Sequence, residues 1–291
     1  MRSGGAASRD TDDTDQIAFS PDGAYAAVAG GGVCHLMEVG TWRSIRKLEE
    51  PWHEGRRDTL RFPAFAPDGR HLLLLCGQLS LRVYEVGTWQ RVQRLPEAPE
   101  DAMQYVPAEK LPRAVVRTVA GQVLLWDSAN YRAISTLDEG VFIAHAAFSP
   151  DESLVAVATA RQPGYSSYWG TPRLRLWRSD TGDLVAELRP FERESDEKIE
   201  GLQWSPDGRY VLAVTKSSTL FTSRGISVFN VRSGRHRGEF GGCPTAVRGI
   251  ALLPDAGQLI AGCNDGKIRF WDFAAAMKQI QEFEASLADG F

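Results

Sequence analysis

The sequence of 291 residues contains no long apolar run and no excess of positive charge. No stretch approaches the roughly 20 consecutive apolar residues that a membrane-spanning helix needs. The 33 basic and 37 acidic residues leave a net charge of −4 at pH 7. A nucleic-acid-binding protein needs a dense Lys and Arg footprint to displace counterions from phosphates. We therefore expect neither a membrane protein nor a nucleic-acid-binding protein.

Cysteine is also scarce. The four cysteines, Cys34, Cys76, Cys243 and Cys263, are far apart and form no Cys-x-x-Cys pair. Cys76 and Cys263 fall inside apolar, strand-like runs, where a free thiol behaves as a small apolar side chain. This spacing argues against a disulfide framework and against a zinc site. The first 15 residues lack the apolar core of a signal peptide, so we expect a cytoplasmic protein with reduced thiols.

What the sequence does contain is an internal repeat. An aromatic residue, one spacer and Pro-Asp-Gly recur at residues 19–23, 65–69 and 204–208, and in weaker form at 105–108, 148–152 and 253–256. Pro fixes φ at the second position of a tight turn, Asp bonds its own backbone, and Gly accepts a positive φ. The spacing of roughly 40 to 56 residues is typical of propeller blades. The repeat therefore predicts six hairpin turns, one for each unit.

Each turn is followed by apolar runs typical of β-strands, such as residues 71–76, 154–159 and 210–215. A third run ends in an aromatic–acidic pair or its variant, and a fourth run follows at, for example, 91–95, 133–137 and 184–188. The third runs end at Met37-Glu38, Tyr84-Glu85, Trp126-Asp127, Trp177-Arg178, Phe229-Asn230 and Trp271-Asp272. This pattern predicts an all-β β-propeller of six four-stranded blades over residues 16–273. A β-sandwich with recurring hairpins is the alternative, but six regular units exceed what a sandwich usually shows.

Across residues 16–273 the chain resembles the WD-repeat β-propeller family, with divergent, bacterial-like repeats. The fit is best at residues 264–272, where Asn-Asp-Gly-Lys-Ile-Arg-Phe-Trp-Asp follows the third-strand signature of the family. Only two of the six units keep a literal Trp-Asp, and none has the Gly-His dipeptide. We therefore expect the Ser/Thr-His-Asp-Trp network of many blades to be absent or partial. The resemblance implies a non-catalytic scaffold that binds a partner protein or peptide.

The two ends of the chain have a different character. Residues 1–15 are rich in Gly, Ala, Ser and Asp, and we expect a disordered tail there. Residues 274–291 place Met277, Ile280 and Leu287 at near-helical spacing, which favours a short C-terminal helical tail. A strand near residues 280–283 that completes the last blade is the alternative. A seventh blade would need strands that the sequence does not show.

The predicted partner-binding surface combines loops that open on one face of the propeller. These are the long second-to-third-strand loop of the fourth unit (161–172), the matching loop of the fifth unit (216–225) and the inter-blade loop 49–58. Tyr, Trp and Arg dominate interface hot spots because they join stiff contact area to a hydrogen-bonding tip. The candidate binding residues are Arg161, Tyr165, Tyr168, Trp169, Trp52, Arg56, Arg57 and Arg224. The alternative is that these aromatic residues cover their own blades.

A propeller enzyme, such as a lactonase or hydrolase acting at the central channel, is the alternative function. A serine nucleophile would want a Gly-x-Ser-x-Gly elbow, and none occurs. A metal site would need His and carboxylate groups that converge from several first strands, and those strands supply little beyond His145 and Glu200. We expect no catalytic activity, no cofactor and no metal. The chain is expected to be monomeric by itself, with a protein or peptide as its partner.

Overall fold

The computed structural model describes residues 16–278, apart from 31, 51, 54–55, 58, 77–79, 93–101, 131, 142, 161–171, 189–196, 218–222, 241–246 and 254–256. This part of the chain is built from β-strands and one short helix at residues 273–278. No described helix is long and apolar enough to cross a bilayer. The chain divides into two compact units, Met1–Val119 with Trp126–Arg132, and Ala120–Leu125 with Ala133–Phe291.

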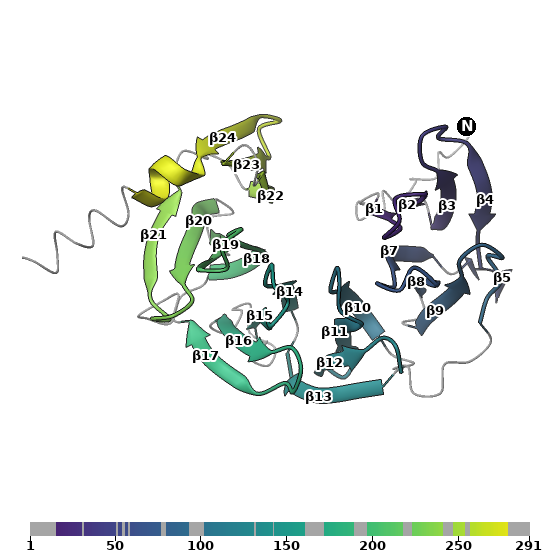
Figure 1. Cartoon of the computed structure of the whole chain (residues 1–291), viewed down its shortest axis with the longest axis horizontal. Helices are drawn as coiled ribbons and strands as arrows, with labels where there is room; N and C mark the ends of the chain where they lie inside the picture. The colour runs from purple at the N-terminus through teal and green to yellow at the C-terminus, as the bar shows by residue number, and fades with distance from the viewer. Residues whose placement is uncertain are drawn as a thin grey trace, which may run out of the picture. The chain divides into compact units, whose positions relative to one another are not determined.

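The strands form successive antiparallel sheets in which neighbours in sequence are neighbours in space (Figure 1). The first blade contains β1 (Gln16–Phe19), β2 (Tyr25–Gly30), β3 (Val33–Glu38) and β4 (Ser44–Leu48), and the second contains β7 (Leu60–Phe65), β8 (His71–Cys76) and β9 (Ser80–Glu85). The third blade contains β10 (Ala102–Pro107), β11 (Arg113–Thr118), β12 (Val123–Asp127) and β13 (Arg132–Asp138), and the fourth contains β14 (Ile143–Phe148), β15 (Leu154–Ala160), β16 (Arg173–Arg178) and β17 (Leu184–Leu188). The fifth blade contains β18 (Glu197–Trp204), β19 (Tyr210–Ser217), β20 (Ser223–Asn230) and β21 (His236–Phe240), and the sixth contains β22 (Val247–Leu253), β23 (Gln258–Cys263) and β24 (Ile268–Asp272).

These six sheets confirm the predicted all-β, six-bladed propeller fold. In the second blade, Arg91 of the predicted run 91–95 forms a bridge with Tyr84 and the Val92 amide donates to the Val83 carbonyl (2.8 Å), while residues 93–95 lie outside the described residues. A short hairpin of β5 (Trp52–His53) and β6 (Arg56–Arg57) replaces the loop predicted at 49–58. The sixth blade has three described strands, and the alternative strand at 280–283 lies outside the described residues.

The helix at residues 273–278 confirms a helical start to the C-terminal tail. Asp272 Oδ1 accepts a hydrogen bond from the Ala275 amide (2.8 Å), so the acidic residue that ends β24 also caps the helix. Met277 is buried in the apolar cluster shared by the fifth and sixth blades, and Phe273 stacks on Phe240 with ring centroids 6.0 Å apart. Packing on these two blades therefore holds the short helix in place.

The hairpin turns use the hydrogen bonds that the Pro-Asp-Gly repeat predicts. Ser20 Oγ donates to Asp22 Oδ1 (2.5 Å) and accepts from the Tyr25 amide (2.9 Å), while the Ala24 amide donates to Asp22 Oδ1 (3.0 Å). The same set recurs with Ser149 and Asp151 in the fourth blade, and with Ser205 and Asp207 in the fifth. In the first blade, the bond from the Ser20 hydroxyl lowers the pKa of Asp22. Each such turn is therefore stabilised by hydrogen bonds among its own residues.

The core of each unit lies between successive blades. In Met1–Val119, Cys34, Leu36 and Leu48 of the first blade pack against Leu60, Phe65, Leu72 and Leu74 of the second. In the other unit, Leu174 and Leu176 of the fourth blade pack against Val211 and Ala213 of the fifth. There the Trp204 indole Nε1 also donates to the Ala147 carbonyl (2.8 Å). Within each unit, apolar strand faces thus join one blade to the next.

Buried ion pairs accompany this packing. Glu50, which follows β4, is 3.3 Å from Arg82 Nε and 3.6 Å from Arg91 Nη1, and it accepts from the Tyr84 hydroxyl (3.3 Å). Burial and the negative charge of Glu50 raise the pKa of Tyr84 to about 12. The fourth blade repeats the arrangement, because Arg175 Nη1 lies 3.4 Å from Asp138 Oδ2 at the end of β13. An acid at the end of one blade therefore pairs with an arginine on the third strand of the next.

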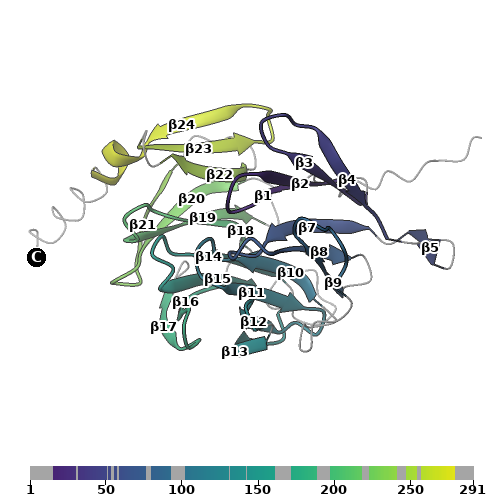
Figure 2. The ribbon, with the colours of Figure 1, turned by 45° about the vertical axis from the view of Figure 1, so that its right-hand side comes forward.

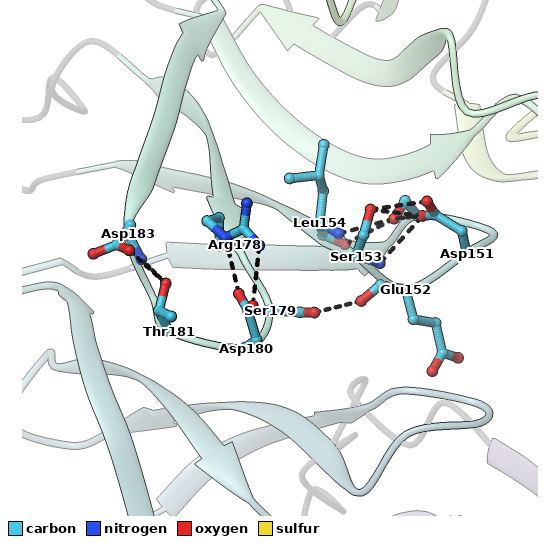
Figure 3. Close-up of polar contacts among 10 residues, drawn as sticks. Asp151, Glu152, Ser153, Leu154, Arg178, Ser179, Asp180, Thr181 and Asp183 are labelled. Atoms are coloured by element: carbon cyan, nitrogen blue, oxygen red, sulfur yellow. Dashed lines mark hydrogen bonds and ion pairs between the residues drawn. The ribbon is translucent and has the colours of Figure 1, made fainter.

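The fourth blade carries an exception to the turn chemistry. Glu152 occupies the position that Gly208 fills in the fifth blade, and it has a positive φ of 56°. Its side chain is 3% exposed. In Figure 3 the Glu152 side chain points away from the Asp151 turn, while its carbonyl accepts a hydrogen bond from the Ser179 hydroxyl. A bulky residue thus adopts a backbone conformation that favours glycine.

Candidate interaction groove

An apolar groove lies at the ends of three first strands in the Met1–Val119 unit. β7 contacts both β1 and β10, and the turns that follow these strands meet at one end (Figure 2). The groove has a volume of about 690 Å³, within the range of about 300–1,000 Å³ typical of binding pockets. It is lined by four aromatic residues and four prolines, Phe19, Phe62, Phe65, Tyr105, Pro21, Pro63, Pro67 and Pro107, together with Ile17, three alanines, Glu109 and Lys110.

Two of these prolines lie within strands. Pro63 belongs to β7 and Pro107 is the last residue of β10. Proline has no amide hydrogen, so it is tolerated in strands whose outer edge needs no hydrogen-bond partner, and β7 and β10 are both edge strands of their sheets. Pro63 and Pro107 can therefore lie at the groove without removing a hydrogen bond between the central strands of a sheet.

The position of Pro107 corrects the repeat alignment. The sequence comparison equated Pro107 with the turn prolines such as Pro21. In the structure, Ala108 instead opens the hairpin, and its amide donates to the Arg113 carbonyl (2.8 Å) as the Ser20 amide does to Tyr25 (2.9 Å). Pro107 consequently takes the strand position that Phe19 has in the first blade.

Phe62 is the most unusual residue of the groove. Arg61 pairs with Leu75 and Ala64 pairs with Leu73, so that Phe62 and Pro63 together oppose one residue in a β-bulge. Phe62 has a positive φ of 51° and remains 38% exposed. A left-handed backbone costs a residue with a Cβ atom about 1–2 kcal/mol. Bulges redirect side chains, and this one places an exposed aromatic ring on the groove wall.

The same ring also borders a second, smaller pocket of about 250 Å³. That pocket is lined by Thr59, Arg61, Phe62, Leu75, Cys76, Ala102 and Met103. Phe62 therefore lines both the groove and this smaller pocket. A change of its rotamer would alter the shape of both.

The charges on the groove are few and balanced. Glu109 and Lys110 are its charged lining residues, and both are exposed at the rim. Its described lining contains no Ser, Cys or His. One anion beside one cation gives no net charge, whereas a polyanionic ligand would need a cluster of Lys and Arg. The surface suits an uncharged apolar segment.

None of the sequence-predicted binding residues is among the described lining of the groove. Arg161, Tyr165, Tyr168 and Trp169 fall outside the described residues. The structure brings the Trp52 and Arg57 backbones into register as partners in the β5–β6 hairpin, with His53 opposite Arg56. Arg224 belongs to β20 in the other unit, where a register shift leaves it between the paired residues Ser223 and Gly225. The loop surface as a whole remains a prediction.

Sequence reasoning missed the groove, although one signal was present. Phe62-Pro63 interrupts a run that otherwise reads as a strand, and an internal proline marks an edge strand or a bulge. The sequence alone does not show that Tyr105 and Pro107, some 40 residues later, line the same groove as Phe62-Pro63.

The described residues contain no group of three or more His, Cys, Asp or Glu side chains placed to hold a metal ion. Cys34, Cys76 and Cys263 are buried free thiols. Burial raises the pKa of the Cys34 thiol to about 12.

The successive antiparallel blades define a β-propeller. The WD40 family model, described as "WD domain, G-beta repeat", matches residues 234–272, which contain β21 to β24. The computationally designed Ika8 protein has a solved structure that is similar with a TM-score of 0.61 and 17% identity, over 86% of this chain and 68% of that one. At that identity the likeness supports the fold alone.

Two curated proteins are similar in sequence. Echinoderm microtubule-associated protein-like 2 of Rattus norvegicus is 28% identical over 162 residues, and coronin-7 of Bos taurus is 29% identical over 154 residues. The matches cover 54% and 52% of this chain but only 22% and 15% of those proteins. The chain thus spans less than a quarter of the length of either relative. Together with the WD40 match, these similarities show that part of the chain resembles WD-repeat proteins.

Proposed function

We propose that the protein is a non-catalytic interaction scaffold, and that the groove on its first three blades binds an extended, proline-rich, uncharged segment of a partner protein. Similarity to WD-repeat proteins supports the general role of a protein-interaction scaffold. The proposal of a proline-rich ligand rests on Phe62, which has a strained backbone and places its ring on the groove wall.

The chemistry of the groove supports this occupant. Proline-rich segments dock on aromatic-lined grooves because their extended helix is formed before binding and loses little entropy. Phe19 and Phe62 offer exposed rings from two different blades, and the buried Tyr105 of a third blade lies among the lining residues. The single Glu109–Lys110 charge pair at the rim favours a neutral segment over an acidic or basic one. Backbone strain is often found at ligand-binding positions, where the surrounding structure enforces it.

The long loop of the fourth unit is proposed as a second contact. Its support comes from composition alone, since Tyr165, Tyr168 and Trp169 are the residue types that dominate interface hot spots. A triple alanine variant of these residues tests it. Retained affinity of that variant for a partner bound by the wild type would exclude the loop.

The groove is tested by fluorescence anisotropy with a labelled decaproline peptide, and an alanine–serine decamer serves as the control peptide. The wild type should bind decaproline, and Phe62→Gly should weaken binding at least about tenfold, because loss of an aromatic anchor at a hot spot costs about 2 kcal/mol or more. Phe62→Gly also relieves the backbone strain, so the variant should remain folded.

Leu184→Ala is the matched control, since it removes an exposed apolar side chain in the other unit. Its affinity for decaproline should equal that of the wild type. No binding by the wild type, or equal binding by Phe62→Gly, would contradict the proposal.

A further inference from the structure

The turn between the third and fourth strands has the same backbone in four blades. At residues 38–43, 85–90, 178–183 and 230–235, the amide of the first residue donates to the carbonyl of the sixth, and the amide of the fifth donates to the carbonyl of the first. The residues of these turns can therefore be compared position by position. Three of the turns contain at least one carboxylate, whereas residues 230–235, Asn-Val-Arg-Ser-Gly-Arg, contain none.

In the other turns, each arginine has a carboxylate partner close by. Glu38 Oε2 in the first blade accepts from Thr41 Oγ1 (2.7 Å) and lies 3.8 Å from Arg43 Nε. In the fourth blade Arg178 donates to both carboxylate oxygens of Asp180, at 3.0 Å each (Figure 3). The positive charges of these turns are therefore balanced within the turns themselves.

The turn of the fifth blade lacks this balance. Asn230 takes the position of Glu38, and its Oδ1 accepts from the Ser233 amide (2.9 Å) and the Ser233 hydroxyl (3.2 Å). An uncharged amide thus makes the hydrogen bonds that hold the turn. Arg232 and Arg235 are exposed, and neither has a carboxylate partner among the described residues.

Two further arginines lie beside this turn. A bulge in β21 leaves Arg237 outside the strand pairing, and its Nη2 donates to Ser233 Oγ (3.2 Å). The Arg209 carbonyl accepts from the Val231 amide (2.9 Å), which holds the preceding hairpin turn of the blade against this one. We call the four residues the fifth-blade arginine cluster: Arg209, Arg232, Arg235 and Arg237.

Nearby carboxylates do not neutralise the cluster. Asp207 lies 3.7 Å from Arg209, and Glu187, whose carbonyl borders the turn, lies 3.1 Å from Arg175 Nε. Glu239 is the one acidic residue in the β20–β21 hairpin, so it can balance one arginine of the cluster at most. The cluster therefore keeps two unbalanced positive charges, although the chain as a whole has a net charge of −4.

We propose that the fifth-blade arginine cluster binds an acidic segment of a partner protein, one with several Asp or Glu residues close together. A guanidinium presents a planar pair of donors that matches the two oxygens of a carboxylate. Arginine is also enriched among the residues that dominate interface energies. Clustered arginines are a recurring means of recognising acidic motifs.

An acidic peptide fits the cluster better than a nucleic acid does. Nucleic-acid binding needs a basic stripe that meets many successive phosphates, whereas this cluster occupies one end of a single blade. The cluster lies in the unit that contains Ala133–Phe291 and shares no residue with the described lining of the groove. The inference is therefore independent of the proline-rich ligand of the proposed function.

Fluorescence anisotropy tests the cluster with a labelled decamer of alternating Glu and Ser, and a decamer of alternating Gln and Ser is the neutral control. Salt of about 50 mM leaves exposed charges weakly screened. The wild type should bind the acidic peptide and not the neutral one. Replacement of both Arg232 and Arg235 by serine should weaken binding at least about fivefold, because each exposed ion pair contributes up to a few-fold. Raising the salt to about 300 mM should also weaken binding by the wild type.

Arg43→Ser is the matched control, since Arg43 takes the position of Arg235 in the first blade but lies beside Glu38. It should bind the acidic peptide like the wild type. Circular dichroism should show the same strand content in all three proteins, because the substituted side chains are exposed. No binding by the wild type, equal binding by the double variant, or an equal loss in Arg43→Ser would overturn the proposal. Tighter binding of a single-stranded DNA decamer than of the acidic peptide would also overturn it.

The two proposals fail separately. The double arginine variant should keep the wild-type affinity for decaproline, and Phe62→Gly should keep the wild-type affinity for the acidic peptide. Loss of both affinities in either variant would contradict the assignment of two separate sites.

Discussion

The backbone at the hairpin turns gives a prediction whose magnitude comes directly from the structure. Gly208 has a φ of +67°, and a Cβ atom built on it would meet only Pro150 Cδ at 3.9 Å, which is an ordinary contact. Gly208→Ala therefore changes the backbone energy without creating a clash. The left-handed conformation should lower the free energy of unfolding by about 1 kcal/mol. For a chain of this size that corresponds to a fall in Tm of about 2–4 °C.

Glu152 provides the reverse experiment at the equivalent turn. Glu152→Ala removes the buried side chain but keeps a Cβ atom at a φ of 56°, while Glu152→Gly removes both. The glycine variant should therefore be more stable than the alanine variant by about 1 kcal/mol. The comparison cancels whatever the carboxylate contributes, because both variants lack it.

Urea unfolding followed by tryptophan fluorescence measures these differences. Gly249→Ala is the matched control, since Gly249 also has open space around a Cβ atom but has no positive φ. It should be neutral or slightly stabilising, because alanine reduces the entropy of the unfolded chain. Equal stability of Glu152→Gly and Glu152→Ala, or no effect of Gly208→Ala, would refute the assignment of strain to these turns.

Three further predictions follow from the buried groups. Glu50→Ala leaves two arginines without their buried partner and should cost about 3 kcal/mol in urea unfolding, while Lys47→Ala, in an exposed ion pair, should cost under about 0.5 kcal/mol. In a background in which Cys76, Cys243 and Cys263 are replaced by serine, a thiol reagent at pH 8 should react with the buried Cys34 only on unfolding; fast labelling of the native protein would contradict its burial. The pKa of Tyr84 near 12 predicts a step in absorbance at 295 nm that Tyr84→Phe removes. Because this pKa is raised on folding, the stabilisation by Tyr84 is complete below about pH 10 and is lost as the pH rises through about 12.

The local part of the fold could be predicted from the sequence. The Pro-Asp-Gly turns form where expected because Ser20 and Asp22, and their counterparts, make all their bonds within five residues. Strand positions followed from the turns. Pro107 was placed wrongly, because the repeat pattern cannot distinguish a turn proline from one at the end of an edge strand. The β5–β6 hairpin was missed because two-residue strands leave no periodic pattern.

The groove could not be predicted in the same way. Its walls come from turns and strand ends of three blades, and the bulge that turns Phe62 outward depends on how β7 pairs with β8. The sequence analysis chose long loops for their aromatic and arginine content instead. Composition identifies residues suited to binding, but it does not show which of them lie next to each other in space.

The two copies of Glu-Val-Gly-Thr-Trp show how little a residue's own segment decides about its environment. Trp42 and Trp89 each end the same five-residue segment and both have a positive φ, yet Trp42 is exposed and Trp89 is buried in the core. Truncating Trp89 removes core packing worth about 3–5 kcal/mol. The same five residues therefore supply one tryptophan that joins the second blade to Tyr25 of the first and another that contacts Phe19 of its own blade.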